Sequence, residues 1–222
     1  MIAIVYPQFY GVGGIARYLD SFLANLPPDH PGVILVTGDE LRDQRSYRGV
    51  EIVHIAFTSN RFSLIEWSLK VRKLLRTWYA QGRISAVNFH FPPLIPGLLL
   101  PREVPVLLTA HTTYLGMSGR YYEQPLFQGQ WSALSLWIKF RMEHFIFRRV
   151  RSVITLSEQG RQEVLRYGYR GPMAIIPNGV DIDRFVPDAM VDKDIDVLFC
   201  GRIERRKGSR PMVELCRRLI AL

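Results

Sequence analysis

Short apolar runs alternate with amphipathic segments along most of the chain. Runs rich in Val, Ile and Leu predict buried strands, and apolar positions at helical spacing between them predict helices. The resulting order of elements is typical of an α/β fold with a doubly wound, mostly parallel sheet. We expect strands at residues 2–6, 33–37, 50–55, 84–90, 105–110, 152–156 and 173–176, and helices at 15–26, 62–79, 131–149 and 157–168.

A turn at Pro177-Asn178-Gly179 ends the last of these strands. A polar connector follows, and residues 196–200 (DVLFC) then return to a buried-strand pattern before a helical pattern at 212–222. We therefore expect a first domain at residues 1–178, a linker at 179–194, and the first strand, loop and helix of a second domain at 195–222.

A cationic loop bounded by glycines, GRIERRKG at residues 201–208, follows the strand expected at 196–200. Free backbone N–H groups and the helix dipole favour an anion at such a helix start. Arg202 offers a planar fork for a phosphate, and Lys207 offers a point charge. The loop therefore predicts a diphosphate site, although a solvated basic loop explains the same residues equally well.

Composition limits the class of protein and of partner. The 48% hydrophobic content of the 222 residues indicates a globular chain with a core. No apolar run approaches the roughly 18 residues that a membrane-spanning helix needs, and the first residues lack a signal-peptide pattern, so we expect a cytoplasmic protein. The net charge of +9 indicates an anionic partner, which nucleic acid, acidic lipid or a phosphate-bearing substrate would each satisfy.

The glycine-rich loop before the first helix has two interpretations. Gly11-x-Gly13-x-x-Ala16 matches a dinucleotide fingerprint, with Asp39 at the tip of the next strand, and predicts an NAD(P)-binding oxidoreductase. Residues 7–10, however, separate the strand from the first glycine by more than that fingerprint allows. A third alternative is a non-catalytic basic binding module. Nucleic acid is not expected as its partner, because no recognition helix or aromatic-studded sheet is evident.

Three segments, GVGGIARYLDSFLANL, IPNGVD and FCGRIERRKG, resemble glycosyltransferase family 4 in their order and spacing. The resemblance implies a retaining enzyme of GT-B fold, with residues 1–178 as its Rossmann-like acceptor half and a truncated donor-binding domain after it. It implies sugar transfer from a nucleotide-sugar substrate to a glycan, lipid or small-molecule acceptor, in glycan or cell-envelope biosynthesis, without a cofactor or a metal. The family's E-x7-E element would lie beyond Leu222.

The resemblance also implies roles for particular residues. The segment LLTAHTTY resembles a T-x-H element whose histidine, here His111, faces the donor sugar. Gly13 and Gly14 match a glycine pair that approaches the diphosphate and sugar, with a tight turn that binds no ligand as the alternative. Arg202 and Lys207 would then neutralise the departing diphosphate, and no dedicated protein base is implied.

Three further residues are candidates on the acceptor side. His90 ends a strand as His111 does, but hydrogen bonding to backbone groups beside Pro92-Pro93 explains it at least as well. Tyr114 and Tyr121 belong to a long aromatic loop that we assign to the acceptor, with simple self-packing as the alternative.

The basic helix expected at 62–79 has a second possible partner. Its apolar face carries two tryptophans, Trp67 and Trp78, that suit the headgroup level of an anionic membrane. We favour packing of this face on the sheet, and keep peripheral contact with the inner face of a membrane as the alternative.

Overall fold

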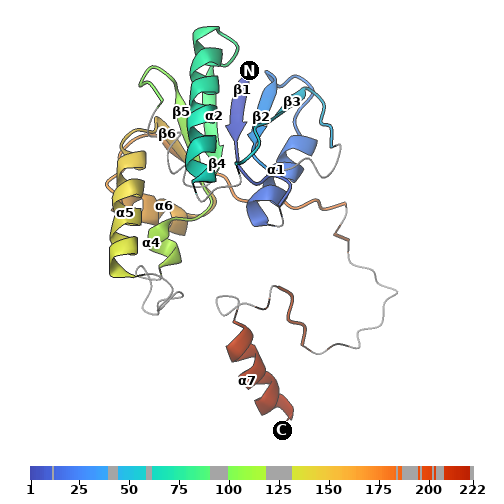
Figure 1. Ribbon diagram of the computed structural model, residues 1–222. Coiled ribbons are helices and arrows are strands. Elements are labelled where there is room, and N and C mark those ends of the chain that lie inside the picture. The colour runs from blue at the N-terminus through green and yellow to red at the C-terminus, as the bar shows by residue number, and fades with distance from the viewer. Residues whose placement is uncertain are drawn as a thin grey trace.

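The computed structural model describes residues 1–11, 13–39, 45–58, 62–90, 100–118, 132–183, 185–186, 195, 197–201, 203 and 208–220. Its main body is an α/β unit in which helices flank one sheet (Figure 1). Among the helices described, none is both long and apolar enough to cross a membrane.

The sheet contains seven parallel strands in the order β3-β2-β1-β4-β5-β6-β7. Every strand expected between residues 2 and 176 is confirmed, with ends that differ by at most two residues. The order reverses between β1 and β4, and ligands of such sheets bind at the strands' carboxyl ends beside that point. The strands are β1 (Ile2–Val5), β2 (Val33–Thr37), β3 (Val50–His54), β4 (Ala86–His90), β5 (Val106–Ala110), β6 (Ser152–Thr155) and β7 (Met173–Ile175).

The helices expected within the main body also form, and a short one was not expected. That short helix, α4 (Tyr114–Met117), lies in the segment interpreted as an aromatic loop. The others are α1 (Gly14–Ala24), α2 (Ser63–Ala80), α5 (Ala133–Phe147) and α6 (Glu158–Arg166).

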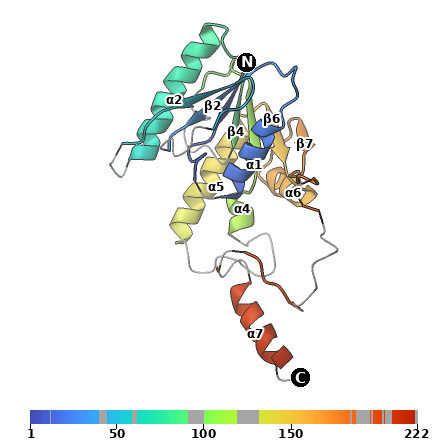
Figure 2. The same cartoon turned by 90° about the vertical axis from the view of Figure 1, so that its right-hand side faces the viewer.

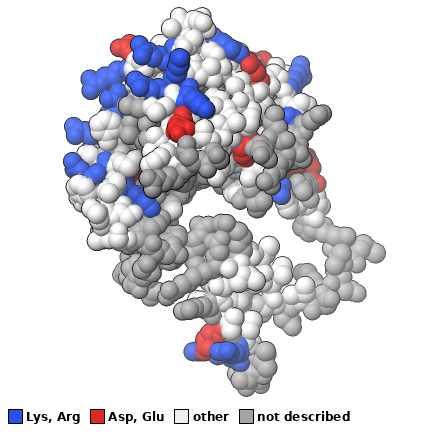
Figure 3. All heavy atoms as spheres, in the orientation of Figure 1, with Lys and Arg blue, Asp and Glu red and all other residues white. Residues whose placement is uncertain are grey.

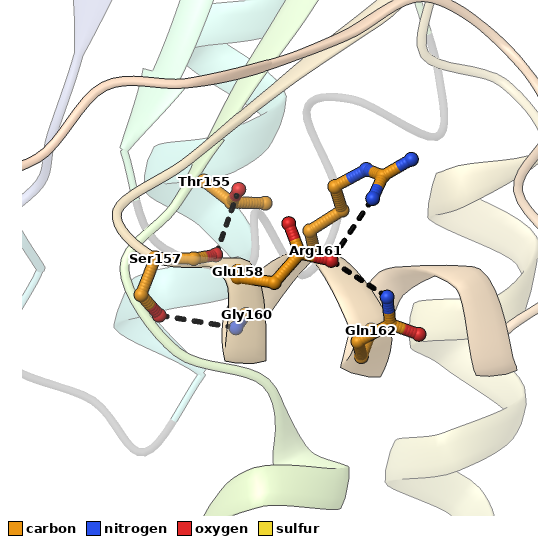
Figure 4. A network of polar contacts seen from close by, with 6 residues as sticks. All are labelled: Thr155, Ser157, Glu158, Gly160, Arg161 and Gln162. Atoms are coloured by element: carbon orange, nitrogen blue, oxygen red, sulfur yellow. Dashed lines mark hydrogen bonds and ion pairs between the residues drawn. The ribbon is translucent and has the colours of Figure 1, made fainter.

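Helix α6 illustrates how local sequence sets these boundaries. The Ser157 hydroxyl accepts a hydrogen bond from the Gly160 amide at 3.1 Å, which caps the helix start (Figure 4). Glu158 in the first turn accepts bonds from Arg161 and Gln162 at 2.9 and 2.7 Å, and its negative charge also complements the helix dipole. Gly168, at a φ of 78°, then ends the segment in a conformation that favours glycine.

Helices cover both faces of the sheet (Figure 2), and an apolar cluster lies on each face. Alternate residues of β1 show the division, because Ile4 packs in the cluster of α1 whereas Ala3 and Val5 belong to the cluster of α2, α5 and α6. Trp67 and Trp78 of α2 are buried in the second cluster, so the sheet-packing interpretation of that helix face is confirmed.

The C-terminal part differs from expectation in one respect. Residues 197–200 form no strand, and Val197, Leu198 and Cys200 are exposed. A strand forms only where a neighbour supplies ladder hydrogen bonds, and the described chain places no strand beside this segment. The helix expected at 212–222 is present as α7 (Ser209–Ile220). Assignment of residues 195–222 to a second domain stays a prediction.

Candidate functional site

His90 and His111 meet at the carboxyl edge of the sheet. The parallel register pairs His90, the last residue of β4, with Thr109 of β5, and His111 follows β5 directly. The Nδ1 atom of His90 lies 3.1 Å from Nε2 of His111, within hydrogen-bonding distance. Neighbouring parallel strands therefore bring together two residues that lie 21 positions apart in sequence.

Helix α1 covers this histidine pair through Tyr18. The Tyr18 ring stands edge-on to His111, with centroids 4.9 Å apart and an interplanar angle of 77°, and its centroid lies 5.7 Å from that of His90. Helix α1 begins at Gly14, about one turn before Tyr18. The start of the helix therefore lies near the histidine pair that Tyr18 contacts.

Burial sets the charge of the pair. It lowers the pKa of His111 to about 4, and together with the neighbouring His111 it lowers the pKa of His90 to about 3. Both rings are therefore neutral near pH 7. A base with so low a pKa accepts protons poorly, so the pair is better suited to hydrogen bonding a ligand than to removing a proton.

The side chain of His90 contacts His111. Its alternative role, hydrogen bonding to backbone groups beside Pro92-Pro93, concerns residues that lie outside the described ranges and stays a prediction. The Nε2 atom of His90 is buried and has no hydrogen-bond partner within the described ranges. An acceptor-side role for His90 and a donor-side role for His111 both stay predictions.

Gly13 and Gly14 border open space at the start of α1. A Cβ atom at either position would meet no other heavy atom within 4 Å. Gly13 is the N-cap, its backbone is extended, and no side chain caps the helix start. The first amides of a helix lack intrahelical partners and attract anions. The open glycine backbone thus leaves room for a phosphate group, as the predicted diphosphate role requires.

Asp39 has a structural role that the dinucleotide interpretation did not foresee. Its two carboxylate oxygens accept hydrogen bonds at 2.6 Å, one from the Tyr10 amide and one from the Thr37 hydroxyl. The residue thereby ties the β1–α1 loop to the end of β2. These bonds explain the position of Asp39 without a dinucleotide, so the residue no longer favours that alternative.

Two buried carboxylates that sequence analysis missed hold the segment after His111. The Tyr114 amide donates to both oxygens of Glu143, at 3.0 and 2.9 Å, and the Tyr167 hydroxyl donates to the same carboxylate. The Thr113 hydroxyl donates to Glu163 at 2.6 Å and accepts from the Gly116 amide. These contacts join α4 to α5 and α6.

The sequence did contain a signal for Glu143. The residue lies three and four positions before Ile146 and Phe147, so an acid interrupts the buried stripe of α5. Burial raises the pKa of Glu143 to about 8, the Tyr167 and Tyr114 bonds oppose that rise, and the neighbouring Glu163 adds to it.

Tyr114 lines a groove of about 430 Å³ between α2 and α5. The Lys139 ammonium lies 5.1 Å from the centre of the Tyr114 ring. Leu64, Ile65, Leu134, Ile138 and Met142 make most of the groove apolar. This position, three residues after His111, fits the predicted acceptor side.

Three predicted site residues, Tyr121, Arg202 and Lys207, lie outside the described residues. Their roles stay predictions. Among the residues that are described, no three His, Cys, Asp or Glu side chains gather as a metal site would require.

Comparison with known proteins gives one family and one fold. The model of Glycosyltransferase Family 4 matches residues 12–184, which is more than half of the chain. Sucrose-phosphate synthase from Thermosynechococcus elongatus superposes with a TM-score of 0.63 at 17% identity, covering 85% of this chain and 50% of that one. HepE from Anabaena, solved with UDP-glucose, superposes with a TM-score of 0.53 at 16% identity, covering 85% and 46%. The chain thus spans about half the length of these proteins. No curated protein matches it.

Proposed function

This chain belongs to Glycosyltransferase Family 4, and on that premise we propose that it takes part in sugar transfer, with retention, from a nucleotide-sugar donor to a carbohydrate or lipid-linked acceptor. We place the reaction in glycan or cell-envelope biosynthesis. The Rossmann-like sheet is the fold of such enzymes' halves, and one of its structural neighbours, HepE, is a complex with UDP-glucose. That complex supports a nucleotide sugar as donor.

The observation that carries the proposal is the arrangement of α1 against the histidine pair. Tyr18 holds His111 beside the helix whose open N-terminus begins at Gly14. A donor diphosphate at these amides would set its sugar near the histidine pair. The neutral His111 then orients the sugar through a hydrogen bond, leaving its Nδ1 atom for the ligand while Nε2 contacts His90.

Arg202 and Lys207 complete the proposed site from the second part of the chain. Their charges would stabilise the diphosphate as negative charge builds on it in the transition state. The reaction needs no metal and no cofactor in this proposal. We also propose that the protein acts in the cytoplasm, at the inner face of a membrane.

Calorimetric titration of the intact protein tests the donor class. We expect a UDP-sugar or another nucleotide sugar to bind, and NAD and NADP to give no heat. Gly14→Ala should weaken donor binding about tenfold or more, because the new Cβ enters the space through which a phosphate approaches the helix amides. Gly160→Ala is the matched control, since its Cβ would make ordinary van der Waals contacts with Thr155 and Ser157.

Initial rates measured with the bound donor test His111. We expect His111→Ala to fold and to lower kcat/KM about 100-fold, the scale of a lost transition-state hydrogen bond. Binding of NAD with no binding of any nucleotide sugar would contradict the proposed function. Unchanged turnover in His111→Ala would remove this residue from the site.

A further inference from the structure

Helices α2 and α5 expose large apolar side chains next to one another. Leu64 and Ile65 of α2 line the same groove as Leu134 and Ile138 of α5. The exposed fraction of these large side chains runs from 38% to 66%, too high for residues of a core. The α2–α5 surface consists of Phe62, Leu64, Ile65, Leu69, Leu134, Trp137 and Ile138.

Packing on the sheet does not account for these residues. The sheet-facing side of α2 is already formed by Trp67, Val71, Leu75 and Trp78, of which none is more than 5% exposed. Ile65 and Leu69 thus give α2 a second apolar stripe beside its buried one, which ends at Leu64, whereas a helix that covers a sheet needs only one. The tryptophans that the sequence offered for a membrane lie in the buried stripe, and Trp137, 61% exposed, lies on the outward side of α5.

Positive charge accompanies the exposed stripe. Leu69 shares a second hollow, of about 560 Å³, with Arg72, Lys73 and Arg76. Helix α2 has one acidic residue, Glu66, which accepts a bond from Thr58, and the acid of α5 is the buried Glu143. Figure 3 shows Lys and Arg gathered over the region of α2.

We propose that the α2–α5 surface docks on an anionic lipid bilayer. Apolar side chains with a tryptophan enter the interface, while neighbouring cations meet acidic headgroups, and this combination binds such surfaces. Nucleic acid would use the cations but would leave the apolar stripe in water. The inference deepens the membrane-proximal location given under the proposed function, but it does not rest on sugar transfer.

Docking on this side would also orient the site. The groove reaches Tyr114, three residues after His111. The proposed acceptor side of the site therefore lies beside the docked surface. An acceptor anchored in the bilayer could then enter along the groove, which suits the lipid-linked class of acceptor in the proposed function.

Vesicle sedimentation of the intact protein tests the inference. We expect it to bind vesicles of equal parts phosphatidylglycerol and phosphatidylcholine, to bind pure phosphatidylcholine at least about tenfold more weakly, and to be released by high salt. Leu134→Ser/Trp137→Ser should weaken binding to the anionic vesicles about tenfold or more. Lys73→Glu/Arg76→Glu should do the same and should flatten the salt dependence.

Matched controls alter the same residue types elsewhere. Ile182→Ser removes an exposed apolar side chain beyond β7, and Arg17→Glu reverses an exposed charge on α1, which lies on the opposite face of the sheet from α2 and α5. Both should bind like the wild type. Circular dichroism and thermal midpoints show that each variant is folded.

Several results would overturn the inference: no binding to anionic vesicles, equal binding to both vesicles, or unchanged binding by the two double variants. A dimer that dissociates in Leu134→Ser/Trp137→Ser, without vesicle binding, would show that a second copy covers the surface instead. Calorimetry with nucleotide sugars tests the proposed function separately. Vesicle binding without donor binding would support the docking surface and contradict the proposed donor site.

Discussion

The imidazole contact between His90 and His111 shows how burial sets the chemistry of individual residues. A buried pair of cations would repel and lose hydration, so both rings stay neutral and one ring donates to the other. In the proposed reaction, neutral rings would provide a directional hydrogen bond to a sugar hydroxyl. A catalytic base would need a pKa closer to 7, which agrees with the absence of a protein base from the proposed reaction.

The depressed pKa values predict an acid-dependent loss of stability. Between pH 6.5 and about 4 the unfolded chain binds protons at these histidines and the folded chain does not, so the free energy of unfolding falls as the pH falls. Between pH 6.5 and pH 4, the double variant His90→Asn/His111→Asn should lose less unfolding free energy than wild type does, by about 2 kcal/mol or more. Urea unfolding at several pH values measures it, and parallel curves for the two proteins would contradict the assigned burial.

Sequence reasoning located most of these residues, though not their contacts. The ends of strands are visible as the last residues of apolar runs, so His90 and His111 could both be placed at the carboxyl edge. Their meeting depends on β4 and β5 being neighbours in register. Tyr18 was visible only as part of the apolar face of a helix. Its contact with the histidines requires the folded position of α1.

At the scale of elements, apolar runs predicted strands well because the sheet buries both of its faces. Two expectations failed or fell short where an element depends on distant partners. Helix α4 is only four residues long, and Glu143 and Glu163, 29 and 50 positions away from the residues they bond, hold its first turn. The apolar segment 197–200 has the composition of a strand but no neighbouring strand to bond with.

The buried bonds of Glu143 predict its response to substitution. Glu143→Ala leaves the Tyr114 amide and the Tyr167 hydroxyl buried without their acceptor, so we expect a loss of about 2–4 kcal/mol of unfolding free energy. Glu143→Gln keeps an acceptor oxygen and should lose less. Chemical denaturation measures both variants, and equal losses would indicate that packing volume, not hydrogen bonding, makes this residue necessary.

The raised pKa of Glu143 gives a pH dependence of opposite sign to that of the histidines. Between about pH 4.5 and pH 8 the folded carboxyl keeps its proton while the unfolded one releases it, so this residue makes stability fall as the pH rises. The free energy of unfolding of Glu143→Gln minus that of wild type should therefore increase from pH 5 to pH 8, by about 2 kcal/mol or more. A constant difference over this range would show that the carboxylate is ionised in the folded protein.

At the scale of the whole molecule, the strand order reverses between β1 and β4, and this reversal determines where the candidate site lies. Helix α1, the end of β4 and the end of β5 meet beside this reversal, the place where sheets of this class bind ligands. On the other face of the sheet, α2 and α5 bury one side against the strands and expose the other. The sequence predicted the basic and apolar character of α2, but only packing on the sheet shows which of its stripes remains exposed.

The distribution of the core predicts which part of the chain folds by itself. All seven strands and both apolar clusters lie within residues 2–175, and the described residues after Val180 contribute no member to either cluster. Since burial of apolar surface supplies most of the folding free energy, a fragment of residues 1–178 should unfold cooperatively, with a urea midpoint close to that of the 222-residue chain.

Hydrogen exchange on the 222-residue chain provides the matching measurement. Amides of β1 and β5, which lie inside the sheet, should exchange through global unfolding, whereas those of residues 197–201, which form no ladder, should exchange within seconds. The amides of α2 serve as an internal reference, because this helix has one side buried on the sheet and the other exposed. If the fragment unfolded without cooperativity, or if residues 197–201 were as protected as β5, residues 179–222 would have to stabilise the sheet through contacts that the core does not contain.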